Sequence, residues 1–242
     1  MDRHLLVTGG SRGIGAAIVR GAAAQGWAVT FTYRNSLAEA EALAAELAGD
    51  GVRVRALAAD RPPAEQYAAA EAGLGPVTAL VNNAGITGPL GAFADSEEEA
   101  ERRIFDVNVH QVFGFCRAAV RAWLDTGTAG SIVNIGSTAA GTGSPGEYLA
   151  YAASKAAVET FTKGLAKELG PAGIRAVVVA PGTTNTGIHA AAGDPGRPAR
   201  VAARIPLGRP AEPEEVAAAV LWLLAPEAAY ITGTVITVAG GQ

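Results

Sequence analysis

The sequence predicts a doubly wound α/β fold, in which about seven parallel strands form one sheet with helices on both faces. Two patterns lead to this prediction. Short apolar segments bounded by Gly, Asn or Asp alternate along the chain with longer, alanine-rich amphipathic segments. The apolar segments are hydrophobic almost throughout, rather than at every second residue, which is typical of strands buried on both faces of a parallel sheet.

The apolar segments have the length of strands. The expected strands are His4–Thr8, Ala28–Tyr33, Arg53–Ala59, Ala79–Asn82, Ser131–Ile135, Arg175–Ala180 and Val235–Val238. The amphipathic segments between them are each long enough for a helix that connects two parallel strands. The expected helices lie at about Gly13–Gln25, Ser36–Ala48, Ala64–Gly73, Glu97–Trp123, Ala150–Leu169 and Pro213–Leu224.

Length and composition limit the classes of protein to consider. A chain of 242 residues with 49% hydrophobic content can bury a large core, so we expect residues 1–242 to form a single domain. The net charge is -4 and the basic residues are scattered, which argues against nucleic acid or an anionic membrane as a partner. The lone Cys116 cannot form an internal disulfide, and no apolar run resembles a signal peptide or a membrane span, so a cytoplasmic location is expected. The three histidines lie far apart without ligand spacing, so no metal site is expected.

Residues 187–210 are rich in Ala, Gly, Pro and Arg. They follow the sixth expected strand, at the sheet edge where ligands bind in such folds. One interpretation is a mobile flap over the substrate, and the other is a solvated connection. Their position at the carboxyl end of a strand favours the flap.

A glycine-rich turn joins the first expected strand to the first expected helix and reads Thr8-Gly9-Gly10-Ser11-Arg12-Gly13-Ile14-Gly15. Gly9 would permit a tight turn, Gly13 would let backbone N–H groups approach a pyrophosphate, and Gly15 would let the helix pack on the strand. A purely structural turn would use the same residues, but the position after the first strand of a βαβ unit favours a dinucleotide site.

The end of the second expected strand bears on the choice of dinucleotide. It reads Tyr33-Arg34-Asn35-Ser36, without the carboxylate that would hold the ribose 2′-hydroxyl of NAD. Arg34 and Arg12 would instead surround the 2′-phosphate of NADP(H), because guanidinium groups form charge-assisted bonds to phosphate oxygens. The alternative is that both are ordinary surface arginines.

Further motifs follow in order along the chain. They are Asp60 after the third strand, Asn82-Asn83-Ala84-Gly85, Asp106-Val107-Asn108-Val109, Asn134-Ile135-Gly136-Ser137, Tyr151-Ala152-Ala153-Ser154-Lys155 and Pro181-Gly182-Thr183-Thr184-Asn185-Thr186. Together with the glycine turn, this ordered set resembles the short-chain dehydrogenase/reductase family from end to end. It looks most like the bacterial branch that contains 3-oxoacyl-carrier-protein reductases and glucose dehydrogenases.

The resemblance implies roles for these residues. Asn108, Ser137, Tyr151 and Lys155 would be catalytic, with Asn108 holding a proton-relay water. The cofactor-binding residues would be Gly9, Ser11, Arg12, Gly13, Ile14, Gly15, Tyr33, Arg34, Asn35, Asp60, Asn83, Ala84, Gly85, Tyr151, Lys155, Pro181, Gly182, Thr184 and Thr186. The family usually assembles through helices at the positions of Glu97–Trp123 and Ala150–Leu169 and through its C-terminal segment, which implies a homo-oligomer, namely a tetramer.

The chemistry of the catalytic residues also makes sense without the resemblance. A free tyrosine has a pKa of about 10 and is a poor proton donor or acceptor at neutral pH. Tyr151 and Lys155 share one helix face, so the ammonium group is expected to lower the phenol's pKa. Ser137 would hydrogen-bond the carbonyl oxygen as negative charge develops on it.

The function expected from these features is the interconversion of a ketone or aldehyde with an alcohol, by hydride transfer with NADP(H). The alternative is a catalytically silent NADP-binding sensor or scaffold subunit. Such a protein would keep the glycine turn but would have little reason to keep Ser137, Tyr151 and Lys155 together. The sequence does not distinguish among 3-oxoacyl thioesters, sugars and polyketide or steroid ketones as substrates.

Overall fold

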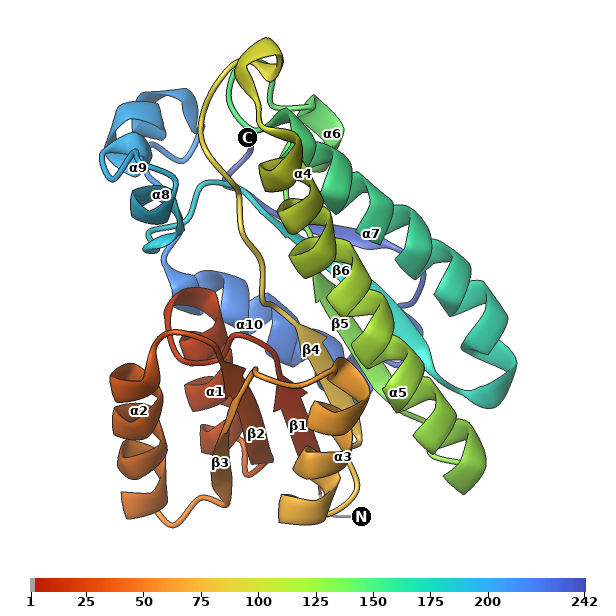
Figure 1. The fold of residues 1–242 in the computed structure, drawn as a ribbon. Coiled ribbons are helices and arrows are strands. Elements are labelled where there is room, and N and C mark those ends of the chain that lie inside the picture. Colours follow the sequence, from red (N-terminus) through yellow and green to blue (C-terminus); the bar gives the residue numbers. More distant parts are fainter. Residues whose placement is uncertain (1–2) are drawn as a thin grey trace.

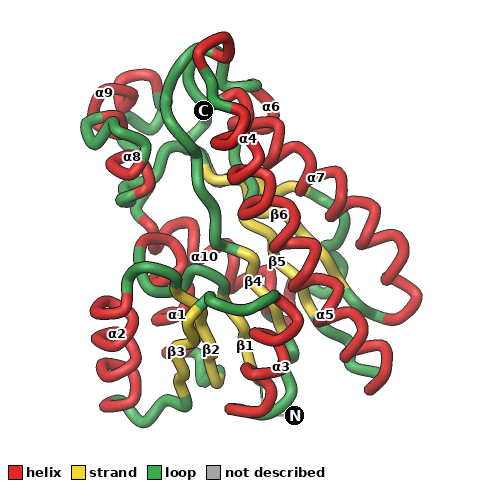
Figure 2. The backbone as a smooth tube through the Cα atoms, in the orientation of Figure 1, coloured by secondary structure: helices red, strands yellow, loops and turns green. Residues whose placement is uncertain are grey.

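A computed structural model of the chain describes residues 3–242 and shows one seven-stranded sheet in the order β3-β2-β1-β4-β5-β6-β7. Each pair of neighbouring strands is parallel, and helices cover both faces (Figures 1 and 2). The strands are β1 His4–Val7, β2 Ala28–Tyr33, β3 Val54–Ala58, β4 Ala79–Asn82, β5 Ser131–Ile135, β6 Arg175–Pro181 and β7 Val235–Val238. The predicted fold class is therefore confirmed, and each predicted strand is present to within one residue at either end.

The helices include the predicted ones and several short additions. The α-helices are α1 Gly13–Ala24, α2 Leu37–Gly49, α3 Pro63–Leu74, α4 Glu98–Phe105, α5 Gln111–Thr126, α6 Ala139–Thr142, α7 Leu149–Leu169, α8 Ile188–Ala191, α9 Arg197–Val201 and α10 Pro213–Leu224. Four 3₁₀ turns lie at η1 Phe93–Asp95, η3 Gly170–Ala172, η4 Ala202–Arg204 and η5 Pro226–Ala228, and η2 Asp106–His110 is a π-helical turn.

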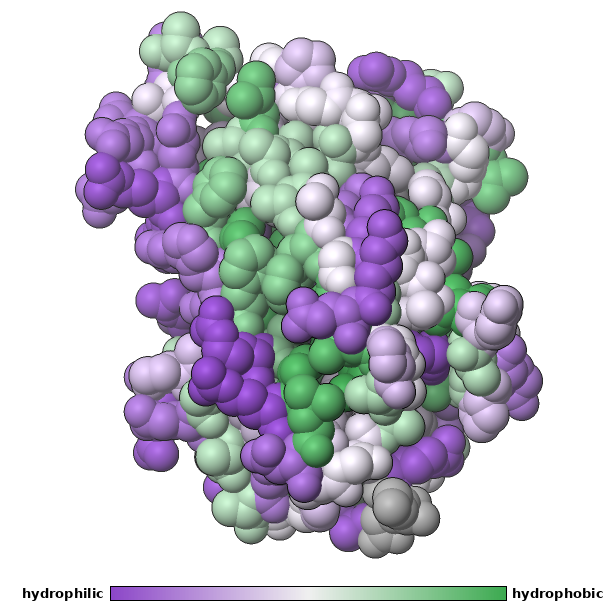
Figure 3. Space-filling view, turned by 90° about the vertical axis from the view of Figure 1, so that its right-hand side faces the viewer, coloured by the Kyte–Doolittle hydropathy of each residue, from purple (hydrophilic) through white to green (hydrophobic). Residues whose placement is uncertain are grey.

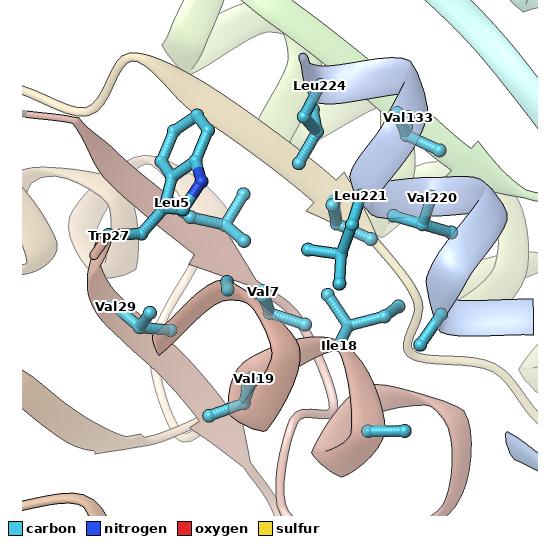
Figure 4. Packing of buried hydrophobic residues seen from close by; sticks show 14 of the residues in the cluster. Leu5, Val7, Ile18, Val19, Trp27, Val29, Val133, Val220, Leu221 and Leu224 are labelled. Carbon is cyan, nitrogen blue, oxygen red and sulfur yellow. The ribbon is translucent and has the colours of Figure 1, made fainter. Parts of the chain in front are cut away.

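The sheet separates two hydrophobic layers because successive side chains of a strand point to opposite faces. Leu5 and Val7 of β1 belong to the layer under α1, α2 and α10, which Figure 4 shows around Ile18 and Leu221. Leu6, between them, packs in the other layer with residues of α3, α5 and α7. Burial on both faces explains why the strands are continuously apolar in the sequence.

The predicted helix Glu97–Trp123 differs from the structure. It is divided into α4 and α5 by the π turn η2, and α5 continues to Thr126. Hydrophobic spacing does not reveal this division, since one extra residue in a turn leaves the apolar face of the helix nearly continuous. Residues 187–210 contain three short helical segments, α8, α9 and η4.

The strand order places a switch point between β1 and β4. From β1 the chain proceeds outward to β2 and β3, then returns to β4 on the other side and continues to β7. In open sheets of this kind, the crevice at the carboxyl ends of the strands at the switch point is where ligands bind.

Over residues 3–242, the structure contains no helix that is both long and apolar enough to cross a membrane. The same part of the chain holds no group of three or more His, Cys, Asp or Glu side chains arranged to bind a metal ion.

Candidate active site

A cleft of about 1380 Å³ lies at the carboxyl ends of the strands. This volume exceeds the roughly 300–1,000 Å³ typical of a site for one small ligand, so the cleft has room for two molecules side by side. The predicted site residues that line it are Gly9, Ser11, Arg12, Gly13, Ile14, Tyr33, Arg34, Asn35, Asn83, Ala84, Gly85, Ser137, Tyr151, Lys155, Pro181, Gly182, Thr184 and Thr186. Three other predicted site residues, Gly15, Asp60 and Asn108, do not line it.

The glycine turn is packed so tightly that side chains would not fit. Gly13 has a φ of +55°, and a Cβ there would lie 3.2 Å from the Thr186 side chain. A Cβ on Gly15 would lie 2.2 Å from the carbonyl oxygen of Gly9. The absence of a side chain at Gly15 therefore lets α1 pack against the turn, although Gly15 itself does not line the cleft.

Asn83 fixes the turn to the end of β4. Its side-chain Nδ2 donates hydrogen bonds to the carbonyl oxygens of Thr8 (3.0 Å) and Gly9 (2.9 Å). The Thr8 hydroxyl in turn accepts hydrogen bonds from the backbone N–H groups of Asn83 and Ala84, both at 3.0 Å. The switch point is thus held by Asn83, which the resemblance assigned to the cofactor, and by Thr8, which it did not.

The end of β2 forms the basic part of the cleft. Arg12 and Arg34 are exposed, and neither side chain has a hydrogen-bond or ion-pair partner among residues 3–242. Close to these arginines in the sequence, the hydroxyls of Ser11 and Ser36 are hydrogen-bonded to each other at 2.6 Å. Asp60, by contrast, has a side chain that is 67% exposed and lies 3.8 Å from Arg61, away from the cleft lining.

Ser137, Tyr151 and Lys155 come together where β5 ends beside α7. The Lys155 Nζ lies 5.7 Å from the centre of the Tyr151 ring and donates a 2.8 Å hydrogen bond to the carbonyl oxygen of Ile135. Burial lowers the pKa of Lys155 to about 8. The Ser137 hydroxyl accepts a hydrogen bond from the backbone N–H of Ala139 at 3.1 Å.

The phenol of Tyr151 differs from the expectation. Burial raises its pKa, whereas a hydrogen bond with Ser137 and the positive charge of Arg197 act in the opposite direction. Lys155 is not among the groups that shift this pKa. The ammonium group is instead hydrogen-bonded to a backbone carbonyl, so sharing a helix face with Tyr151 is not enough to lower the phenol's pKa in this arrangement.

Asn108 lies in the π turn η2 and is fully buried. Its Nδ2 donates to the Ile86 carbonyl (2.9 Å) and to the Ser154 hydroxyl (3.0 Å), and its Oδ1 accepts from the Ile86 N–H (2.9 Å). Ser154 donates to the carbonyl oxygen of Tyr151 at 2.7 Å. The Asn108 side chain therefore joins the loop after β4 to the turn of α7 that carries Tyr151.

The structure adds residues that the sequence analysis did not place in the site. Tyr148 lines the cleft beside Tyr151, with the two rings 6.2 Å apart and nearly perpendicular at 71°. Arg197 of α9 forms an ion pair with Glu147 and lies over the Tyr148 ring. His189 of α8 also lines the cleft, and nothing in the sequence separates Arg197 from the other arginines of residues 187–210.

Comparisons with known proteins agree with this geometry. Residues 9–242 match the protein-family model described as enoyl-(acyl carrier protein) reductase. The chain is 41% identical over 243 residues to an uncharacterized oxidoreductase of Escherichia coli, YgfF, with 98% of each chain covered. It is 38% identical over 245 residues to 3beta-hydroxysteroid dehydrogenase 1 of Eggerthella lenta, covering 99% of this chain and 93% of the relative.

Two solved structures share the fold closely. A blue fluorescent protein from a metagenomic library, in complex with NADPH, has a TM-score of 0.90 and 38% identity. A short-chain dehydrogenase from Burkholderia cenocepacia, in complex with NADP, has a TM-score of 0.90 and 35% identity. Both comparisons cover 99% of this chain and 97% of the other.

Proposed function

The chain belongs to the short-chain dehydrogenase/reductase family of oxidoreductases, and from this premise we propose that it interconverts a ketone or aldehyde with an alcohol by using NADP(H). One observation carries the proposal. The cleft has unpaired arginines at one end and the group Ser137, Tyr151 and Lys155 at the other. The first suits a phosphorylated dinucleotide, and the second suits a carbonyl that gains a proton.

The residues present fit NADP(H). Gly13, with no side chain, lets the backbone at the start of α1 come close to a pyrophosphate, and the helix N-terminus favours negative charge there. Arg12 and Arg34 would hold the 2′-phosphate, and Tyr33 stands where a carboxylate would repel it. The relatives in complex with NADP and NADPH support the same assignment. When bound, NADPH supplies the hydride that is added to the carbonyl carbon.

The chain's own residues then supply the proton and the charge stabilisation. Tyr151 donates its phenolic proton to the carbonyl oxygen. Its raised pKa keeps the phenol protonated at neutral pH, so the proton is available for donation. Ser137 donates a hydrogen bond to the same oxygen as it becomes negative. Lys155, which lines the cleft and is charged below a pH of about 8, would donate hydrogen bonds to the ribose of the bound dinucleotide beside Tyr151. Asn108 positions this group through Ser154.

The proposal is tested by following NADPH consumption with a panel of ketones and aldehydes. The wild-type protein is expected to reduce at least one of them, and Tyr151→Phe is expected to bind NADPH normally without supporting turnover. Tight NADPH binding with no turnover on the whole panel, by wild type and variant alike, would instead indicate a sensor or scaffold.

A further inference from the structure

Three buried polar atoms without a hydrogen-bond partner lie on residues that line one end of the cleft. Within residues 3–242, the Tyr148 hydroxyl, the His189 Nδ1 and the Arg197 Nε make no hydrogen bond. Tyr148 is only 5% exposed and His189 only 8%. A buried polar group without a partner costs about 1–3 kcal/mol, so such groups call for an explanation.

The three side chains come from separate elements but share one environment. His189 lies on α8, Arg197 begins α9, and Tyr148 immediately precedes α7. The Arg197 guanidinium carbon is 5.2 Å from the centre of the Tyr148 ring. The charge of Arg197 also acts on the His189 imidazole. All three line the same cleft as Tyr151, whose ring is 6.2 Å from that of Tyr148.

The charges at this end of the cleft indicate what kind of group would bind. Arg197 is already paired with Glu147, and the neighbouring Arg200 is paired with Asp194, whereas Arg204 lines the cleft as an exposed side chain of the turn η4. A carboxylate placed here would meet the like charge of Glu147. A hydroxyl group carries no charge, and it can accept from Arg197 Nε–H while donating to or accepting from the other two side chains.

We propose that Tyr148, His189 and Arg197 form a subsite for a neutral hydroxyl group of the substrate, next to the reacting carbonyl. The substrates are then hydroxyketones or hydroxyaldehydes, and the products are the corresponding diols or polyols. This assignment rests on the proposed carbonyl reduction. The proposal goes beyond that function by naming the substrate group that the side chains of α8 and α9 would bind.

The test compares three ketones with saturating NADPH, namely cyclohexanone, 2-hydroxycyclohexanone and 3-oxocyclohexanecarboxylate. The wild-type protein is expected to show a kcat/KM about ten times higher or more for the hydroxyketone than for cyclohexanone, as one buried hydrogen bond would provide. Arg197→Met and Tyr148→Phe are expected to remove most of that preference, mainly through KM, while changing the rate with cyclohexanone much less. The matched control is Arg200→Met, which removes an arginine of the same helix that does not line the cleft. It should keep the preference.

A binding measurement separates this proposal from the proposed function. In thermal unfolding with saturating NADP, trans-1,2-cyclohexanediol should stabilise the wild type and Arg200→Met but not Arg197→Met. If ketones are reduced without a preference for the hydroxyl, or with a preference for the carboxylate, the subsite is wrong and the reductase function stands. If no ketone is reduced but the diol stabilises only the proteins with Arg197, the subsite stands and the reductase function is wrong. If no ketone is reduced and the diol does not stabilise the wild type, both the subsite and the reductase function are wrong.

Discussion

The Lys155 ammonium donates a 2.8 Å hydrogen bond to the carbonyl oxygen of Ile135, at the end of strand β5. This bond ties the buried charge of α7 to the sheet. It also explains why Lys155 is held beside Tyr151 without lowering the phenol's pKa, since the ammonium is directed to the backbone.

Reduction should decline as the pH rises through about 8. Burial lowers the pKa of Lys155 to about 8, so the side chain loses its charge above that value, and the charge-assisted hydrogen bonds that it would donate to the cofactor ribose become weaker. The measurement is the pH profile of kcat/KM for any ketone that the protein reduces. Lys155→Arg keeps the charge at all accessible pH values and should move the decline upward, whereas Lys155→Met should be nearly inactive and bind NADPH more weakly. If the decline near pH 8 persists in Lys155→Arg, another titrating group causes it and the prediction is wrong.

Tyr151 and Tyr148 should respond very differently to loss of the hydroxyl. Tyr151→Phe should cut kcat by about two to four orders of magnitude, the range for loss of a positioned acid, without loss of NADPH binding. Tyr148→Phe should act mainly on KM, because its ring lines the cleft but has no lysine one turn further along the helix. Steady-state kinetics of both variants, with cofactor binding measured separately, checks this. An inactive Tyr148→Phe beside an active Tyr151→Phe would reverse the assignment.

The protein should bind NADPH more tightly than NADH. Arg12 and Arg34 have no partner among residues 3–242 and would form charge-assisted bonds to the 2′-phosphate, each worth about 1.5–3 kcal/mol. The double substitution Tyr33→Asp with Arg34→Ala should reverse the order. Fluorescence titration with both cofactors measures the effect, and Arg61→Ala is the control, since Arg61 does not line the cleft. Equal affinity of the wild type for the two cofactors would contradict the prediction.

The protein should be less stable in mild acid because of His4. This side chain is buried, its Nδ1 donates to the Gly75 carbonyl at 2.8 Å, and its Nε2 lies 2.9 Å from the Thr30 hydroxyl. Burial lowers the pKa of His4 in the folded state, so the unfolded chain binds the proton more readily. The stabilisation is complete above the unfolded pKa of about 6.5 and is lost as the pH falls below it.

Chemical denaturation at about pH 7.5 and about pH 5.5 measures this change. His4→Gln should reduce the difference in unfolding free energy between the two pH values, although His189, whose pKa is also lowered, retains part of it. His110→Gln is the control, because His110 is on the surface beside Asp106. A pH dependence that is unchanged in His4→Gln would exclude His4 as its source.

The protein should assemble into a homotetramer. The face that carries α5 and α7 shows a broad band of hydrophobic and neutral residues in Figure 3, and Phe113 and Phe161 pack together between these helices at 4.1 Å. Trp222 of α10 is also 46% exposed, in the C-terminal part expected to form a second interface. Light scattering should give a mass near four times 24.3 kDa. Trp222→Glu should reduce the measured mass by half. Leu37→Glu, on the exposed side of α2, is the control and should leave the mass unchanged. A wild-type monomer at micromolar concentration would refute the assembly.

The layers of the fold and the residues of the candidate active site could be predicted from the sequence alone. Continuous apolar segments identified strands buried on both faces, because such strands have no polar side to display. Motif order placed Ser137, Tyr151 and Lys155 together, and the structure brings them to one end of one cleft. These properties are local, since each depends on a few neighbouring residues and on the fixed geometry of helix and strand.

The contacts of individual side chains could be identified only from the tertiary structure. Asn108 is turned toward Ile86 and Ser154 by a π turn that does not interrupt the hydrophobic pattern. Asp60 does not line the cleft although it follows β3. Arg197 contacts the Tyr148 ring although it lies 49 positions further along the chain, with β6 and α8 between the two residues. Contacts of this kind depend on how distant elements pack, and hydrophobic periodicity carries no information about which of several similar arginines will face the site.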